Sequence, residues 1–208
     1  MGFINNSCSF SRFRIIDPVP DSLIADLGQR LIKYAFQDIE DIPEMQAFGW
    51  VSYEDMLDSR WESAPPFKGE FAVFSLRLDT RRIPAGVIKK HLALAIRAEK
   101  ERLAGQNQKF ISRERKKELR EQVLLALRQR FLPVPAEFNV IWNLQSHEVW
   151  FASTQAKMID LFMEYFLNSF ELHLEQLTPY NLACALLDEA DLEKLDKIQA
   201  TDFIVAPA

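Results

Sequence analysis

The chain has 208 residues, of which 48% are hydrophobic and 12% aromatic, so it can build a core and is not a disordered tail. Its two cysteines, Cys8 and Cys184, form no CxxC pattern, which argues against a disulfide framework or a zinc site. No apolar run approaches the roughly 18 residues that cross a bilayer, and residues 1–10 lack the features of a secretory signal. We therefore expect a cytoplasmic protein of one large or two small domains, with no membrane contact.

The basic residues are concentrated in one part of the chain. Sixteen of the 25 lie between Arg77 and Arg130, together with only six acidic residues, so this stretch carries a formal charge of +10 and the rest carries −15. The net charge of −5 argues against a nucleic-acid-binding protein. The segregation argues for one, because the electrostatic field and counterion release depend on local charge density.

The first third of the chain predicts strands and one helix. Apolar and aromatic residues between turn signals indicate strands at 9–17 and 71–78, and a short strand or turn at 45–53. A helix is predicted from about 21 to 36, between the segments at 9–17 and 45–53, because leucines and isoleucines recur at helical spacing.

The basic stretch predicts two helices, at 87–103 and 112–132, separated by a break at 105–108. Each has an apolar stripe and a cationic face, so we expect an antiparallel helical hairpin. Glu99 falls within the apolar arc of the first helix and interrupts it. The cations of the two faces are the candidate phosphate-binding residues: Lys89, Lys90, Arg97 and Lys100 in the first helix, and Arg113, Lys116, Lys117 and Arg120 in the second.

The last third predicts strands at 138–144 and 148–153, a helix at 155–168, a strand at 170–177 and an amphipathic segment at 188–198. The fold class is therefore α+β, with antiparallel sheets, packed helices and a projecting helical hairpin between a β-α-β-β half and a β-β-α-β half. The predicted units are an N-terminal half at 1–82, the basic hairpin at 83–135, a C-terminal half at 136–180 and a short helical tail at 181–208.

The second basic helix carries its cations in its first turns, where they oppose the helix dipole and cost a few tenths of a kcal/mol each. A sequence selected for stability alone would place acids there, whereas a cationic helix N-terminus is favourable for phosphate. Because Phe110 is the one aromatic residue interleaved with these cations, contact with the backbone of duplex DNA fits better than stacking on single-strand bases. The alternative is a solvated helical arm whose cations pair with Glu114, Glu118 and Glu121.

Catalysis has little support in the sequence. The three histidines, His91, His147 and His173, show no metal-binding spacing, and no nucleophile or phosphate-loop motif occurs. Glu171, His173 and Glu175 would share one face of a strand, which is typical of an exposed polar face. We expect no enzyme activity and no cofactor or metal, although carboxylates from distant parts of the chain could still converge on Mg²⁺.

Several segments resemble the family of the recombination-associated protein RdgC. Residues 44–51 are similar to its "QxM…GWV" segment, residues 83–89 to its "LPxxVI" helix start, and residues 113–131 to its "RKExxxLKxEVxxxLLPxAF" segment. A hairpin with Trp142 and Trp150 and a helix beginning at Ala156-Lys157 follow in the same order. Together these segments span roughly residues 9–180.

The resemblance implies a nucleoid-associated protein without catalytic activity, which as a homodimer encircles duplex DNA with little sequence preference and restrains RecA-type strand exchange. It also implies a shortened member, because the family usually continues beyond this chain's end. Two other functions stay open: a protein-interaction module that uses the hairpin as a dimer or partner interface, and a metal-dependent nuclease.

Overall fold

The computed structural model describes residue 3 and residues 7–105 and 110–199. Seven strands and six helices follow one another along these residues. The strands are β1 (Ser11–Ile15), β2 (Gln46–Ser52), β3 (Phe67–Lys68), β4 (Phe71–Thr80), β5 (Val134–Asn143), β6 (Glu148–Phe151) and β7 (Leu174–Gln176). The helices are α1 (Asp21–Lys33), α2 (Ala85–Ala104), α3 (Arg113–Arg128), α4 (Ala156–Phe170), α5 (Pro179–Leu186) and α6 (Glu189–Leu195).

The strands form one antiparallel sheet in the order β2-β4-β5-β6-β1-β7, with the short β3 paired to β4. The longest pairing joins β4 to β5, from Phe71 opposite Asn143 to Thr80 opposite Val134. The predicted α+β class and the predicted order of elements are confirmed, with β3 and α5 as additions. Because β4 and β5 come from the two predicted halves, the halves share a single sheet.

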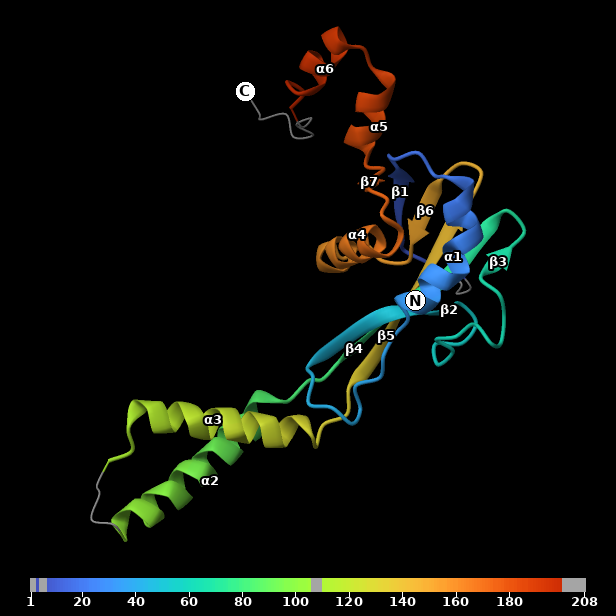
Figure 1. Ribbon diagram of the computed structural model, residues 1–208. Coiled ribbons are helices and arrows are strands. Elements are labelled where there is room, and N and C mark those ends of the chain that lie inside the picture. Colours follow the sequence, from blue (N-terminus) through green and yellow to red (C-terminus); the bar gives the residue numbers. More distant parts are fainter. Residues whose placement is uncertain (1–2, 4–6, 106–109, 200–208) are drawn as a thin grey trace, which may run out of the picture.

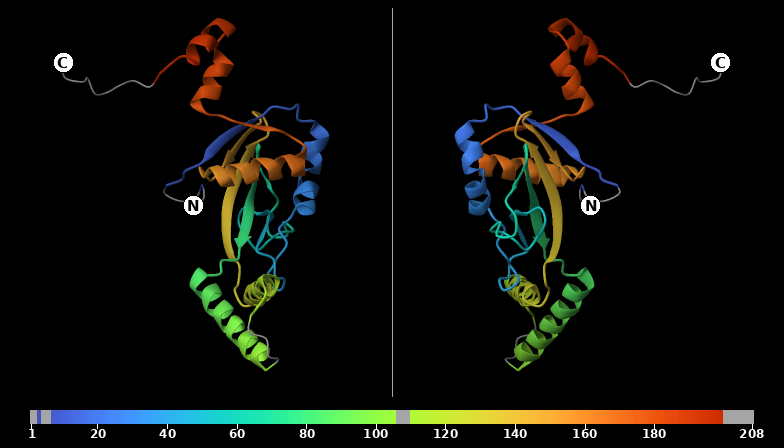
Figure 2. Two further views of the ribbon diagram at one scale, coloured as in Figure 1. Left: turned by 90° about the vertical axis from the view of Figure 1, so that its left-hand side faces the viewer. Right: turned by 90° about the vertical axis from the view of Figure 1, so that its right-hand side faces the viewer.

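The core lies between the sheet and helices α1 and α4, which cover one of its faces (Figures 1 and 2). It is rich in aromatic rings: Phe162 of α4 stacks on Phe151 of β6 with centroids 4.2 Å apart. Trp50 is fully buried, and its indole N–H donates to Ser169 Oγ at 2.8 Å. These contacts make the sheet a rigid base for the elements that leave it.

The edge strand β2 is approached closely by the segment that follows α1. The amide of Phe36 donates to the carbonyl of Trp50 at 2.9 Å, and the amide of Trp50 donates to the carbonyl of Tyr34 at 3.0 Å. Gly49 makes this approach possible, because a Cβ at that position would lie 2.4 Å from the Phe36 backbone.

Helices α2 and α3 project from the end of the sheet where β4 leaves and β5 returns (Figures 1 and 2). They pack against each other, which confirms the predicted hairpin. Helices α5 and α6 lie at the opposite end of the molecule. No helix in the described part of the chain is long and apolar enough to cross a membrane.

The strand predicted at 170–177 is wrong in its first half. Helix α4 continues to Phe170 and ends at Glu171, which adopts a left-handed conformation with φ 61°, so only residues 174–176 pair as β7. Glu171, His173 and Glu175 therefore do not form one polar strand face. His173 instead lies 3.0 Å from Asp17, measured from its Nδ1 to Oδ2.

Candidate nucleic-acid interface

The hairpin is anchored to the sheet by Arg81, which lies between β4 and α2. Its side chain is buried, and its guanidinium donates five hydrogen bonds of 2.5 to 3.1 Å to backbone carbonyls. One acceptor is Phe131, just after α3, and the others lie in the loop before β2, at Ile39, Glu40, Ile42 and Glu44. This one side chain therefore joins both ends of the hairpin to the loop before β2.

Arg77 is also withdrawn from the surface. Its guanidinium makes two 2.8 Å hydrogen bonds to the carboxylate of Asp79, and these bonds raise the pKa of Arg77. It also lies over the ring of Phe36, 4.1 Å from the centroid. Arg77 and Arg81 thus belong to the basic stretch of the sequence but are not available to an external phosphate.

Helices α2 and α3 meet through a small apolar contact. Leu103 of α2 and Leu119 and Leu127 of α3 are its buried leucines. Ser112 caps α3 as predicted, because its hydroxyl accepts a hydrogen bond from the Arg115 amide at 3.1 Å. So few buried leucines leave most of the surface of both helices exposed to solvent.

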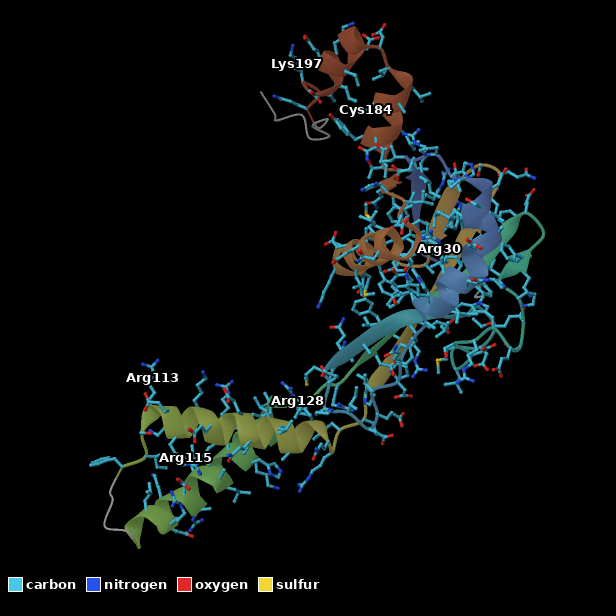
Figure 3. All side chains as sticks on the ribbon, viewed as in Figure 1. Arg30, Arg113, Arg115, Arg128, Cys184 and Lys197 are labelled. Atoms are coloured by element: carbon cyan, nitrogen blue, oxygen red, sulfur yellow. The ribbon has the colours of Figure 1, made fainter. Side chains whose placement is uncertain are left out.

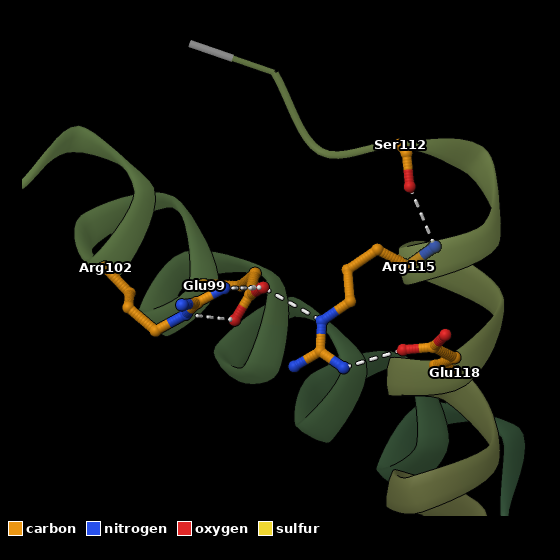
Figure 4. A network of polar contacts seen from close by, with 5 residues as sticks. All are labelled: Glu99, Arg102, Ser112, Arg115 and Glu118. Atoms are coloured by element: carbon orange, nitrogen blue, oxygen red, sulfur yellow. Dashed lines mark hydrogen bonds and ion pairs between the residues drawn. The ribbon is translucent and has the colours of Figure 1, made fainter. Parts of the chain in front are cut away.

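A buried carboxylate completes this contact (Figure 4). Glu99 of α2 is only 6% exposed and accepts hydrogen bonds from Arg102 at 2.8 and 3.1 Å and from Arg115 of α3 at 2.9 Å. Arg115 extends the network by donating to Glu118 at 2.7 Å. The hydrogen bonds from Arg102 and Arg115 lower the pKa of Glu99 to about 2, and those to Glu99 raise the pKa of both arginines.

The network explains why Glu99 interrupts the apolar arc of the sequence, since it faces α3 in place of a leucine. Arg115 is the functional candidate that sequence reasoning missed. The signal was present, because Arg115 lies four residues before Leu119 and so shares the buried stripe of α3.

All eight predicted phosphate-binding residues are exposed on the hairpin. Two are engaged by neighbouring acids: Arg97 lies 3.6 Å from Glu101, and Lys117 lies 4.0 Å from Glu121. The other six form no ion pair with any residue that the structure describes; they are Lys89, Lys90, Lys100, Arg113, Lys116 and Arg120. Lys109, another basic residue of the stretch, lies outside the described residues.

The eight residues lie on one flank of the hairpin. Glu99 and Leu119 mark the side of each helix that faces the other, and each residue turns the helix by about 100°. Measured from Glu99, the four cations of α2 lie about 80° to 180° around the helix axis. Measured from Leu119 in the same direction of rotation, the four cations of α3 lie about 60° to 160° around it. Because α2 runs outward and α3 runs back, rotations of the same sense lead to the same side of the pair. Figure 3 shows the contrast on α3, where Arg113 points away from α2 and Arg115 points towards it. We call this surface of eight residues the basic flank.

The exposed acidic residues of the hairpin lie on the other side, with Glu101 and Glu121 at its edge beside Arg97 and Lys117. On α3, the opposite direction of rotation from Leu119 leads to Glu114, Glu118 and Glu121, at about 100° to 160°. On α2, the same opposite direction from Glu99 leads to Glu101, at about 160°. All four are exposed, as are Leu94 and Leu125 on the same side. We call this surface the acidic flank. The charge segregation seen along the sequence is therefore repeated across the hairpin itself.

Elsewhere, polar clusters are sparse. No group of three or more His, Cys, Asp or Glu side chains is placed to hold a metal ion within residues 7–105 and 110–199. The largest cluster of hydrogen bonds to one carboxylate outside the hairpin surrounds Asp58, which accepts from the amides of Arg60, Glu62 and Ser63. It lies in the loop between β2 and β3.

A family model described as "Putative exonuclease, RdgC" matches residues 9–187 of the chain. The chain belongs to the RdgC family. No curated protein matches it in sequence. The RdgC match covers every strand of the sheet, the whole basic hairpin and helices α1 to α5. The resemblance stated from the sequence motifs is confirmed.

Proposed function

We propose that this RdgC-family protein is a non-catalytic DNA-binding protein that holds duplex DNA, independently of sequence, with the basic flank of its hairpin. The observation that carries the proposal is the placement of eight exposed cations on one flank, six of them without an ion-pair partner among the described residues. Cations in such a row neutralise phosphates and release counterions, which is the main source of sequence-independent affinity.

The chemistry of the flank favours the phosphate backbone over the bases. Its members are all lysines and arginines, which contact phosphate as charges and carry no ring on which a base could stack. Phe110, 88% exposed, is the one aromatic residue near the free end of the hairpin in the described part of the chain. The acidic flank repels phosphate, so one duplex lies along the basic flank alone.

We further propose that the protein acts as a homodimer in the cytoplasm, associated with the nucleoid, and that it restrains RecA-type strand exchange by occupying the DNA. Membership of the RdgC family supports this wider role. The physical basis is competition, because phosphates covered by one protein are not available to another.

The deciding experiment is a fluorescence anisotropy titration of labelled 30-base-pair duplexes of unrelated sequence at several salt concentrations. The proposal predicts equal affinities for the sequences and a log–log salt slope of about −0.9 for each phosphate contacted. With up to eight cations engaged, the slope should reach about −7 at most. Absence of binding at low salt would overturn the proposal.

The same samples test the two other functions. Incubation of linear duplex with Mg²⁺ or Mn²⁺ would reveal a nuclease by shortening of the DNA, which the non-catalytic proposal does not allow. If the hairpin is instead a protein interface, charge reversal on its basic flank would change the sedimentation of the protein and leave DNA affinity unaltered.

A further inference from the structure

The Glu99 network joins two helices through a single buried carboxylate. Both oxygens of Glu99 accept hydrogen bonds, from Arg102 on its own helix and from Arg115 on α3. Arg115 is the residue that crosses between the helices. Its guanidinium also donates to Glu118, and its backbone amide donates to the hydroxyl of Ser112, the cap of α3 (Figure 4). Among the described residues, the pair formed by Glu99 and Arg115 is the one ion pair between α2 and α3.

Stability alone does not explain a carboxylate at this place. Withdrawing it from water carries a desolvation penalty, which a leucine packed against Leu103 and Leu119 would avoid. Apolar contacts also allow neighbouring helices to slide and rotate, whereas charge-assisted hydrogen bonds to a guanidinium fix distance and angle. The apolar stripes hold three buried leucines and the half-buried Leu92, Ile96 and Val123, and the ion pair adds the directional contact between the helices.

We propose that Glu99 is a positioning residue for DNA binding: through Arg115 it fixes α3 against α2, so that the cations of both helices present one continuous basic flank. This inference rests on the function proposed above. Glu99 itself does not touch DNA, and as an acid it would repel phosphate. It acts by keeping the two rows of cations in register with one duplex.

The proposal makes a prediction opposite to that of simple electrostatics. Glu99→Gln removes a negative charge from the hairpin, so a purely electrostatic effect would tighten DNA binding. If Glu99 positions the helices, the variant binds at least threefold more weakly and its salt slope becomes shallower by about 1 to 3, because fewer phosphates are contacted at once. The matched control is Glu114→Gln, which removes the same charge from an exposed residue of the acidic flank that pairs with no described residue.

A charge-neutral double variant separates the two effects further. Glu99→Gln combined with Arg115→Gln keeps the net charge of the natural protein but removes the link between the helices. Electrostatics alone predicts unchanged affinity, whereas a positioning role predicts weak binding with the same shallow slope as Glu99→Gln. Far-ultraviolet circular dichroism of each variant verifies that the helices are still formed.

A measurement without DNA tests the arrangement directly. Spin labels at Leu94→Cys and Leu125→Cys, both exposed positions on opposite helices, report the distance between α2 and α3 in a protein with Cys8→Ser and Cys184→Ser. The distance distribution should be narrow in this background, broad after Glu99→Gln and narrow after Glu114→Gln.

If the natural protein does not bind DNA, the proposed function fails. A distance distribution that stays narrow after Glu99→Gln would separately overturn the positioning role. If the natural protein binds and Glu99→Gln binds as tightly as Glu114→Gln, the positioning role is overturned while the proposed function stands.

Discussion

Four arginines of the basic stretch between Arg77 and Arg130 are bound by other residues of the protein. Arg81 and Arg77 are buried against carbonyls and a carboxylate, and Arg102 and Arg115 are bound to Glu99, so these four serve the structure of the protein. The lysines of α2 and α3 are exposed to solvent instead. An arginine has five donors in a fixed planar arrangement and suits several acceptors at once, whereas lysine carries a compact charge on a flexible chain.

Replacing Arg81 by methionine should lower the free energy of unfolding by about 3 kcal/mol, because it leaves buried carbonyls without donors. Arg81→Lys should recover only part of this loss, since an ammonium has three donors for five acceptors. Urea unfolding, followed by the fluorescence of the buried Trp50 and Trp142, measures the change. Arg82→Met, at the exposed neighbouring position, should stay within about 0.5 kcal/mol of the natural protein, and equal losses for both would contradict the anchoring role.

Glu99 should make the hairpin sensitive to acid. The pKa of Glu99 is lowered from 4.5 to about 2 by its hydrogen bonds with Arg102 and Arg115, so the unfolded hairpin binds the proton more readily. The stabilisation is therefore complete above pH 4.5 and is lost as the pH falls through about 2. Hydrogen exchange of α2 and α3 amides over this range, compared with Glu99→Gln, measures it. A natural protein with no more pH dependence than the variant would contradict the assignment.

At the scale of elements, the close approach of the segment after α1 to β2 depends on a missing side chain. Gly49→Ala places a Cβ 2.4 Å from backbone atoms of Phe36, which cannot move without breaking the hydrogen bond from its amide to the Trp50 carbonyl. We expect the free energy of unfolding to fall by about 2 kcal/mol or more. Gly28→Ala is the control, since nothing lies within 4 Å of its added Cβ and it sits inside α1. It should stabilise the protein by about 0.5 to 1 kcal/mol. Urea midpoints of the two variants that move in the same direction would refute the explanation.

The sequence predicted most elements because their patterns are local. The apolar stripes of α1, α3 and α4 and the aromatic run of β4 each identify their element without knowledge of its neighbours. The segment 170–177 was misassigned because alternating Leu172 and Leu174 look like a strand, while the left-handed turn at Glu171 depends on how α4 ends against the sheet. Helix α5 was not predicted, since it buries no residue and has no strong apolar periodicity.

At the scale of the whole molecule, the eight exposed cations of the hairpin lie together on the basic flank. The hairpin projects from an acidic remainder of the chain, and of its own exposed acids only Glu101 and Glu121 pair with described cations of the basic flank. The proposed DNA binding is compatible with a net charge of −5, because the field at the basic flank depends on the local density of its cations.

Charge reversal at Lys116, Lys117 and Arg120 should weaken binding to every duplex alike, by at least tenfold, and make the salt slope shallower by about 2.7 if each residue contacts one phosphate. The control has the same change of net charge away from the hairpin: reversal at Lys33, Arg60 and Lys157, all exposed. Anisotropy with duplexes of unrelated sequence measures both. An equal loss of affinity in the two triple variants would mean that net charge, not the basic flank, governs binding.

The sequence by itself determined the class of the fold, the hairpin, the family and the concentration of basic residues in the hairpin, because periodicity and charge density are properties of short stretches of chain. It did not determine that the two halves share one sheet, since pairing of β4 with β5 joins residues separated by the whole hairpin. Nor did it determine which basic residues are buried. The roles of Arg81 and of the pair formed by Glu99 and Arg115 depend on partners 16 to 50 residues away, which only the tertiary structure brings into contact.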